Sequence, residues 1–239
     1  NLVGIEFGTA INESMSIAIS TQLGSNTIET SKQPDVKESG FTDLVLKATK
    51  IQNQTANTQL YYGATASISP TDNEIAYNDG KGNSSTGNLF SGGHTLTPFL
   101  GYQMDNSGFI LGTQGSYTIM GERTLSRKDF KQSINGGNTL AANIYAESLK
   151  NKILLGAKAG LSMVRPYDFE NDQKGLKTKS DTGAFQLLKL GAYGKITVNQ
   201  KLELLPNIGL TRLMNSSGGK ISLEQNDEFT AYLSARIAL

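Results

Sequence analysis

The C-terminal stretch Phe229-Thr-Ala-Tyr-Leu-Ser-Ala-Arg-Ile-Ala-Leu239 decides the fold class, because its side chains alternate between apolar and polar. The odd-numbered positions are apolar throughout: Phe229, Ala231, Leu233, Ala235, Ile237 and Leu239. The even-numbered positions are mostly polar: Thr230, Tyr232, Ser234, Arg236 and Ala238. Successive side chains of a β-strand point to opposite faces of its sheet. This period of two therefore predicts a strand with one apolar face and one polar face.

The same alternation recurs along the chain, and helical periodicity never competes with it over a comparable length. Ten strands are predicted in all, at residues 12–22, 42–52, 57–69, 94–104, 107–120, 137–148, 151–164, 184–197, 201–213 and 228–239. Residues 1–11 are ambiguous, because Val3, Ile5 and Phe7 continue the odd-numbered apolar face of the next strand. They form either an N-terminal extension or an extra strand, so a count of twelve strands stays open.

The links between the predicted strands alternate in length. Short links lie at 53–56, 105–106, 149–151 and 198–200, whereas long links lie at 23–41, 70–93, 121–136, 165–183 and 214–227. Short turns at one end and long loops at the other are typical of an antiparallel up-and-down barrel. The predicted strand length of roughly 10–13 residues matches a tilted membrane barrel, whose spans need about 9–11 residues. The alternative is a soluble barrel or sandwich, although sandwich strands usually have only about 5–6 residues.

Composition narrows the possible functions. A chain of 239 residues is long enough to close one sheet as a single domain over 1–239. The net charge of +1 argues against nucleic acid as a partner. No Cys and one His exclude thiolate and multi-His metal sites, so no cofactor is expected. No apolar run approaches the length of a transmembrane helix. The chain begins at Asn1 rather than Met, as a mature or trimmed product would.

With these strands laid out, the whole chain resembles the small Gram-negative outer-membrane β-barrels. In that family the last strand alternates apolar residues and is read by the barrel-assembly machinery. Leu233, Ala235 and Ile237 supply the alternation here, whereas Leu239 stands where the family usually ends in Phe. The resemblance implies a transmembrane barrel in the bacterial outer membrane, with extracellular long loops, periplasmic short turns and a lipid-facing apolar surface. It leaves a homo-oligomer formed through the apolar faces as an alternative.

If the apolar faces point to lipid, the polar faces line a lumen. The expected lumen-lining residues are Glu147, Lys158, Lys189, Lys195, Glu203, Arg236, Tyr145, Tyr193 and Tyr232. Glu203 and Arg236 are the first expected ion pair, because unpaired charges in a small interior are costly. We expect tyrosine rings to project inward and the lumen to be largely closed by its own side chains. The functional interpretation is a narrow porin-like conduit for small solutes or ions; the alternative is a plugged structural barrel that binds lipid or a partner.

An outer-membrane lipid hydrolase or protease is a less favoured hypothesis. His94 is the only candidate general base, with Asp72, Glu74, Asp79 and Ser91 nearby in the sequence. No Gly-x-Ser-x-Gly elbow surrounds any serine, so we predict that the protein is not an enzyme.

The charges of the long links have two interpretations. The acidic runs 168–172 and 226–228 lack the spacing of an EF-hand, which favours solvated charge over a calcium site. The basic residues of these links could meet lipopolysaccharide phosphates if the links face outward, solvated charge again being the alternative. They are Lys32, Lys37, Lys81, Arg123, Arg127, Lys128, Lys174, Lys177 and Lys179.

Overall fold

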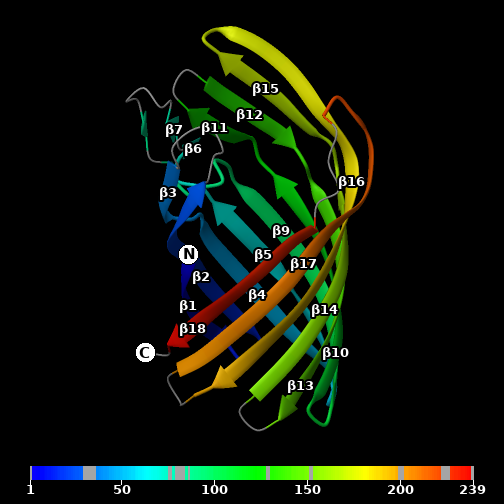
Figure 1. The fold of residues 1–239 in the computed structure, drawn as a ribbon. Coiled ribbons are helices and arrows are strands. Elements are labelled where there is room, and N and C mark those ends of the chain that lie inside the picture. Colours follow the sequence, from blue (N-terminus) through cyan, green and yellow to red (C-terminus); the bar gives the residue numbers. More distant parts are fainter. Residues whose placement is uncertain are drawn as a thin grey trace.

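The structure is a computed structural model that describes residues 2–28, 36–74, 77–78, 84–85, 87–127, 130–150, 153–198, 202–221 and 227–237. Its described residues form a large antiparallel sheet that curls into a barrel-like wall (Figure 1). The long strands of the meander are β1 (Leu2–Asn12), β2 (Met15–Ile28), β4 (Leu44–Thr55), β5 (Thr58–Ile68), β9 (Thr95–Asn106), β10 (Phe109–Met120), β13 (Thr139–Lys150), β14 (Ile153–Val164), β16 (Leu176–Thr197), β17 (Leu202–Gly219) and β18 (Asp227–Ile237). Each pairs antiparallel with the next, as an up-and-down topology requires.

The ten predicted strands are confirmed, and the ambiguity at the N-terminus is resolved in favour of an extra strand. β1 pairs with β2 over most of its length, with Phe7 opposite Ile19. The chain reverses at residues 13–14, where the Asn12 side-chain oxygen accepts a hydrogen bond from the Ser14 amide at 3.0 Å. An Asn side chain that bonds the backbone two residues later favours such a tight turn. The odd-numbered apolar alternation continues in phase through this turn, so the sequence pattern gives no sign of it.

Three of the expected long loops are largely strand, which corrects the sequence prediction. Residues 23–41 contain the end of β2 and the whole of β3 (Val36–Phe41). Residues 121–136 contain β11 (Arg123–Arg127) and β12 (Phe130–Gly136), and residues 165–183 contain β15 (Tyr167–Gln173) and the first part of β16. β12, β15 and β16 pair antiparallel and raise the wall above the meander. The remaining short strands are β6 (Asn73–Glu74), β7 (Tyr77–Asn78) and β8 (Ser84–Ser85).

A line of breaks separates this upper tier from the lower wall. β10 and β11 are interrupted at residues 121–122, β12 and β13 at 137–138, and β14 and β15 at 165–166. These breaks lie at one height, since the Arg165 amide donates to the Asn138 carbonyl and the Met120 amide donates to the Asn138 side chain. Pro166 cannot donate to a ladder, so the hydrogen bonding is interrupted where the wall bends.

The burial pattern is the reverse of that in a soluble protein. Among the described residues, the buried hydrophobic side chains are Phe99, Ile134, Val164 and Leu213. Large apolar side chains of the meander are exposed instead: Ile144 is 64% exposed, Leu155 63% and Leu233 65%. A continuous apolar surface of this kind requires an apolar environment or a partner to cover it.

The height of the apolar band matches a membrane. On β14 the exposed apolar face runs from Ile153 to Met163. At about 3.3 Å per residue and a tilt of roughly 40°, these residues span about 25 Å, the height of the lipid-facing band of outer-membrane barrels. None of the described residues belongs to a helix that could cross a membrane.

Above this band the strands carry paired charges. Glu170 of β15 pairs with Lys177 at 3.5 Å and with Lys179 at 3.2 Å. These ammonium groups, Lys179 first, lower the pKa of the Glu170 carboxyl. Charges that are solvated and paired in this way belong in water, so the upper tier stands outside the apolar band.

The two edges of the meander, β1 and β18, approach each other (Figure 1). Among the described residues no ladder of hydrogen bonds joins them. Because consecutive strands alternate in direction and β1 is an additional strand, β1 and β18 run parallel to each other.

Candidate functional site: the polar inner face

The polar side of the wall is its concave side, because its side chains meet across intervening strands. The Tyr61 hydroxyl of β5 passes β9 and donates to the Thr113 carbonyl of β10 at 3.4 Å. The Tyr145 hydroxyl of β13 passes β10 and donates to the Gln103 side chain of β9 at 2.9 Å. Curvature of the sheet toward these side chains, which Figure 1 shows in the ribbon, brings such contacts within reach. The polar residues therefore face the interior and the apolar residues face outward.

Three inner tyrosines each lie across a glycine of the neighbouring strand. The backbone register places Tyr61 opposite Gly101, Tyr145 opposite Gly112 and Tyr193 opposite Gly156. A Cβ atom at any of these glycines would overlap the tyrosine ring.

The rings therefore lie along the wall, whereas the sequence predicts that the rings of Tyr145 and Tyr193 project into the lumen. The physical reason is that a bare glycine backbone offers a flat apolar surface to an aromatic ring. A glycine on the polar face, opposite a tyrosine in register, is the signal that finds these pairs, but it requires knowledge of the register.

Hydrogen bonds connect several of the predicted lumen residues. The Tyr193 hydroxyl donates to the Glu147 carboxylate at 2.6 Å, and the Lys158 ammonium lies 5.9 Å from the centre of the Tyr193 ring. Tyr145 bonds Gln103, which in turn donates to Gln59 at 2.9 Å. Lys158 itself lies over Gly191. The inner face thus holds a lattice of phenol, amide, carboxylate and ammonium groups.

The carboxylate of Glu203 pairs with a lysine of the predicted lumen set rather than only with Arg236, the partner expected first. The Lys195 ammonium lies 3.6 Å from it, on the adjacent strand β16. The predicted pairing of Glu203 with Arg236 is present in the backbone register, where their Cα atoms are partners. The side chains of Arg236 and Tyr232 lie outside the described residues.

Lys189 is placed on the same inner face, with Gly160 and Thr211 as its cross-strand neighbours. It is exposed, and no hydrogen bond or ion pair joins its ammonium to another described residue. Lys189 is therefore the predicted lumen residue whose charge is most available to a solute.

An aromatic cluster where the lower wall meets the upper tier was not predicted. The Tyr167 ring stacks on Phe185 with centroids 6.2 Å apart, and the centre of the Phe169 ring also lies 6.2 Å from that of Tyr167. The Arg123 guanidinium lies 5.2 Å from the Tyr167 ring centre. The alternation of Tyr167 and Phe169 signals a strand inside a predicted loop, but the stacking depends on the bend at residues 165–166.

His94 lies where β9 begins, and its contacts are structural. Its Nδ1 accepts a hydrogen bond from the Ser69 amide at 3.3 Å. Asp43, the carboxylate that contacts this loop, accepts from the Ser91 amide at 2.9 Å and from the Ser67 hydroxyl at 3.2 Å. Among the described residues no carboxylate contacts His94, and Asp79 lies outside them. This geometry gives no support to a hydrolase.

Among the described residues, no three His, Asp or Glu side chains come close enough together to bind a metal ion. These residues therefore give no support to a metal site. Within the acidic run 168–172, the Glu170 carboxylate pairs with lysines.

No protein-family model and no curated protein sequence matches the chain. Solved structures that resemble it include FpvA of P. aeruginosa bound to heterologous pyoverdines, at 12% identity and a TM-score of 0.42, covering 99% of this chain and 38% of that one. The ferric yersiniabactin uptake receptor FyuA from Yersinia pestis is similar at 10% identity and a TM-score of 0.41, covering 98% of this chain and 42% of that one. The chain thus spans about two fifths of the length of each.

Proposed function

We propose that the protein is an integral outer-membrane β-barrel whose polar interior is a narrow conduit for small solutes or ions. The observation that carries this proposal is the inverted polarity of the wall. Its convex face exposes apolar side chains such as Ile144 and Leu155 over the height of a membrane, and its concave face is polar and hydrogen-bonded. A wall of strands can cross lipid only as a closed barrel, so the proposal requires that the edge strands β1 and β18, which approach each other, also pair.

The inner face favours a narrow and slightly basic passage. Lys158, Lys189 and Lys195 stand against Glu147 and Glu203 among the predicted lumen residues. Rings that lie along the wall leave more of the cross-section to water than rings that project. The lattice that joins Tyr193, Glu147 and Lys158 nevertheless occupies part of a small interior.

Neutralising Lys189 should change the conductance of the barrel. In planar bilayers we expect small single-channel steps, and Lys189→Gln should shift the ion preference away from anions because an inward positive charge is lost. Lys177→Gln is the matched control, since this lysine lies in the upper tier outside the apolar band, and it should leave conductance unchanged.

A wild-type protein that inserts into the bilayer without conducting would favour the second candidate, a structural barrel that binds lipid or a partner. The specific observation behind that candidate is the lattice itself, which ties β9, β13 and β16 together through side chains. A conductance as large as that of a general porin would contradict both candidates.

The upper tier is expected to face the cell exterior. Trypsin added to intact cells that carry the protein should cleave within 70–93 or 165–183. Lys174 is the best-defined site, since it is exposed in the turn between β15 and β16. The short connection at 198–200 should stay intact because it faces the periplasm. Mass spectrometry of the fragments reports the sites, and cleavage confined to the short turns would reverse the orientation.

A further inference from the structure

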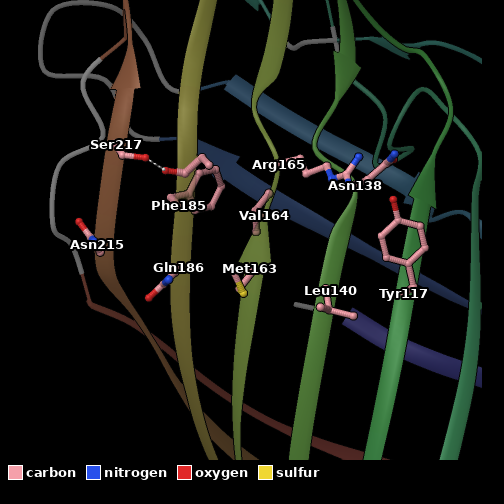
Figure 2. Close-up of a pocket in the computed structure, with 11 residues that line it drawn as sticks. Tyr117, Asn138, Leu140, Met163, Val164, Arg165, Phe185, Gln186, Asn215 and Ser217 are labelled. Carbon is pink, nitrogen blue, oxygen red and sulfur yellow. Dashed lines mark hydrogen bonds between the residues drawn. The ribbon is translucent and has the colours of Figure 1, made fainter.

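A groove of about 600 Å³ lies on the convex face of the wall, just below the line of breaks (Figure 2). Its floor crosses five strands in register: Tyr117 pairs with Leu140, Leu140 with Met163, Met163 with Gln186, and Gln186 with Asn215. Leu140 and Met163 are exposed apolar residues of the outward face, which places the groove on the outside.

Two irregularities of the sheet create this groove. The register between β16 and β17 shifts at Gln186, so that Met214 is an extra residue between the pairs Leu187–Leu213 and Gln186–Asn215. A β-bulge of this kind bends its strand and increases the local twist. On the neighbouring strand, the ladder is broken at residues 165–166 between β14 and β15. The wall therefore opens where the apolar band ends.

The lining changes from apolar to polar along the strands. Leu140 and Met163 are 54% and 55% exposed and belong to the apolar band. Arg165 and Asn138 line the groove one step nearer the upper tier. Its lateral side carries the amides of Gln186 and Asn215, both exposed. An apolar floor under a cationic and amide rim is suited to a molecule with a hydrocarbon chain and an anionic head.

The Arg165 guanidinium is available to such a head. It is exposed, and within the described part of the chain it has neither a hydrogen bond nor an ion pair. Arginine binds phosphate through paired, charge-assisted hydrogen bonds.

We propose that this groove is a binding site for lipid A, the phosphorylated glycolipid anchor of lipopolysaccharide. Its phosphate contacts Arg165, and an acyl chain lies along Leu140 and Met163. The inference rests on the proposed function, because only an outer-membrane barrel with its upper tier outside exposes this groove to lipopolysaccharide. It differs from the expectation that the lysines of the long links contact lipopolysaccharide, since Lys177 and Lys179 are paired with Glu170.

Native mass spectrometry of the detergent-solubilised barrel tests the site. Three probes are added separately: lipid A, dephosphorylated lipid A and phosphatidylglycerol. We expect the wild type to bind lipid A at least tenfold more tightly than either other lipid. Arg165→Gln should weaken lipid A binding by about tenfold or more, the effect of losing a charge-assisted hydrogen bond. Arg165→Lys should retain part of the affinity, since it keeps the charge but loses the paired geometry.

The matched control is Arg212→Gln, which removes an exposed arginine of β17 that is already paired with Asp227 at 3.2 Å. It should leave lipid A binding unchanged. Equal affinities of wild type and Arg165→Gln would overturn the proposal. So would equal binding of lipid A and phosphatidylglycerol, which would make the occupant an ordinary phospholipid.

Insertion into phosphatidylcholine vesicles, followed by circular dichroism, is measured on every variant. Failure of the wild type to insert would overturn the proposed function. Insertion without selective lipid A binding would overturn only the proposal that the groove binds lipid A. Arg165 has no described side-chain partner, so its variants are expected to insert like the wild type.

Discussion

Ala157→Arg should lower the free energy of unfolding from lipid vesicles by roughly 2–4 kcal/mol, the cost of a cation near the bilayer midplane on the lipid-facing side of a barrel. Ala157 is exposed and lies near the middle of β14, between the apolar residues Leu155 and Leu161 of the same face. The cost arises because the lipid chains cannot solvate the guanidinium. Urea titration of the vesicle-inserted protein measures the change. Because the chain contains no tryptophan, unfolding is monitored by circular dichroism.

Two controls separate charge from size and the outer face from the inner face. Ala157→Leu adds volume without charge and should cost less than about 1 kcal/mol. Gln114→Arg places the same cation on the half-buried inner face of β10 and should also cost far less than Ala157→Arg. Ser162 also faces inward, but it is only 3% exposed, so an arginine there would be costly for steric reasons. Equal costs at Ala157 and Gln114 would mean that the faces are reversed or that the protein is soluble.

Gly156→Ala should destabilise the barrel by about 1–3 kcal/mol, the usual cost of overpacking, and should reduce its conductance. The new methyl group overlaps the Tyr193 ring, which must leave the wall and move into the lumen. That movement also strains the hydrogen bond from Tyr193 to Glu147. Unfolding in urea and single-channel recording measure the two effects.

The double variant Gly156→Ala with Tyr193→Ala isolates the steric term. Removing the ring should abolish the cost of the methyl group, so the two substitutions should be strongly non-additive. Gly115→Ala is the control for a glycine without a neighbour, because nothing lies within 4 Å of its Cβ position. It should be neutral or slightly stabilising. Additive effects of Gly156→Ala and Tyr193→Ala would show that the ring does not rest on Gly156.

The predicted strands and their faces were correct because alternation is a local property. The side chains of residues i and i+2 share a face whichever strand lies next to them. Phe229, Ala231 and Leu233 therefore predict an apolar face without any knowledge of the pairing. The alternation of short and long links is also visible in the local sequence. It predicted the antiparallel order because a short turn can join only neighbouring antiparallel strands. Where local signals overlapped, as at residues 12–15, the same reasoning left two possibilities open.

By itself, then, the sequence determined that this chain is a meander of long strands with one apolar and one polar face. Which inner groups touch was decided by the register, because partners such as Tyr193 and Glu147 or Tyr61 and Thr113 are separated by dozens of residues and by an intervening strand. The outer groove depends on a bulge at Gln186 and a break at Arg165, which periodicity does not encode. Contacts across strands arise from the curvature and stagger of the whole sheet, and these exist only once the strands are paired.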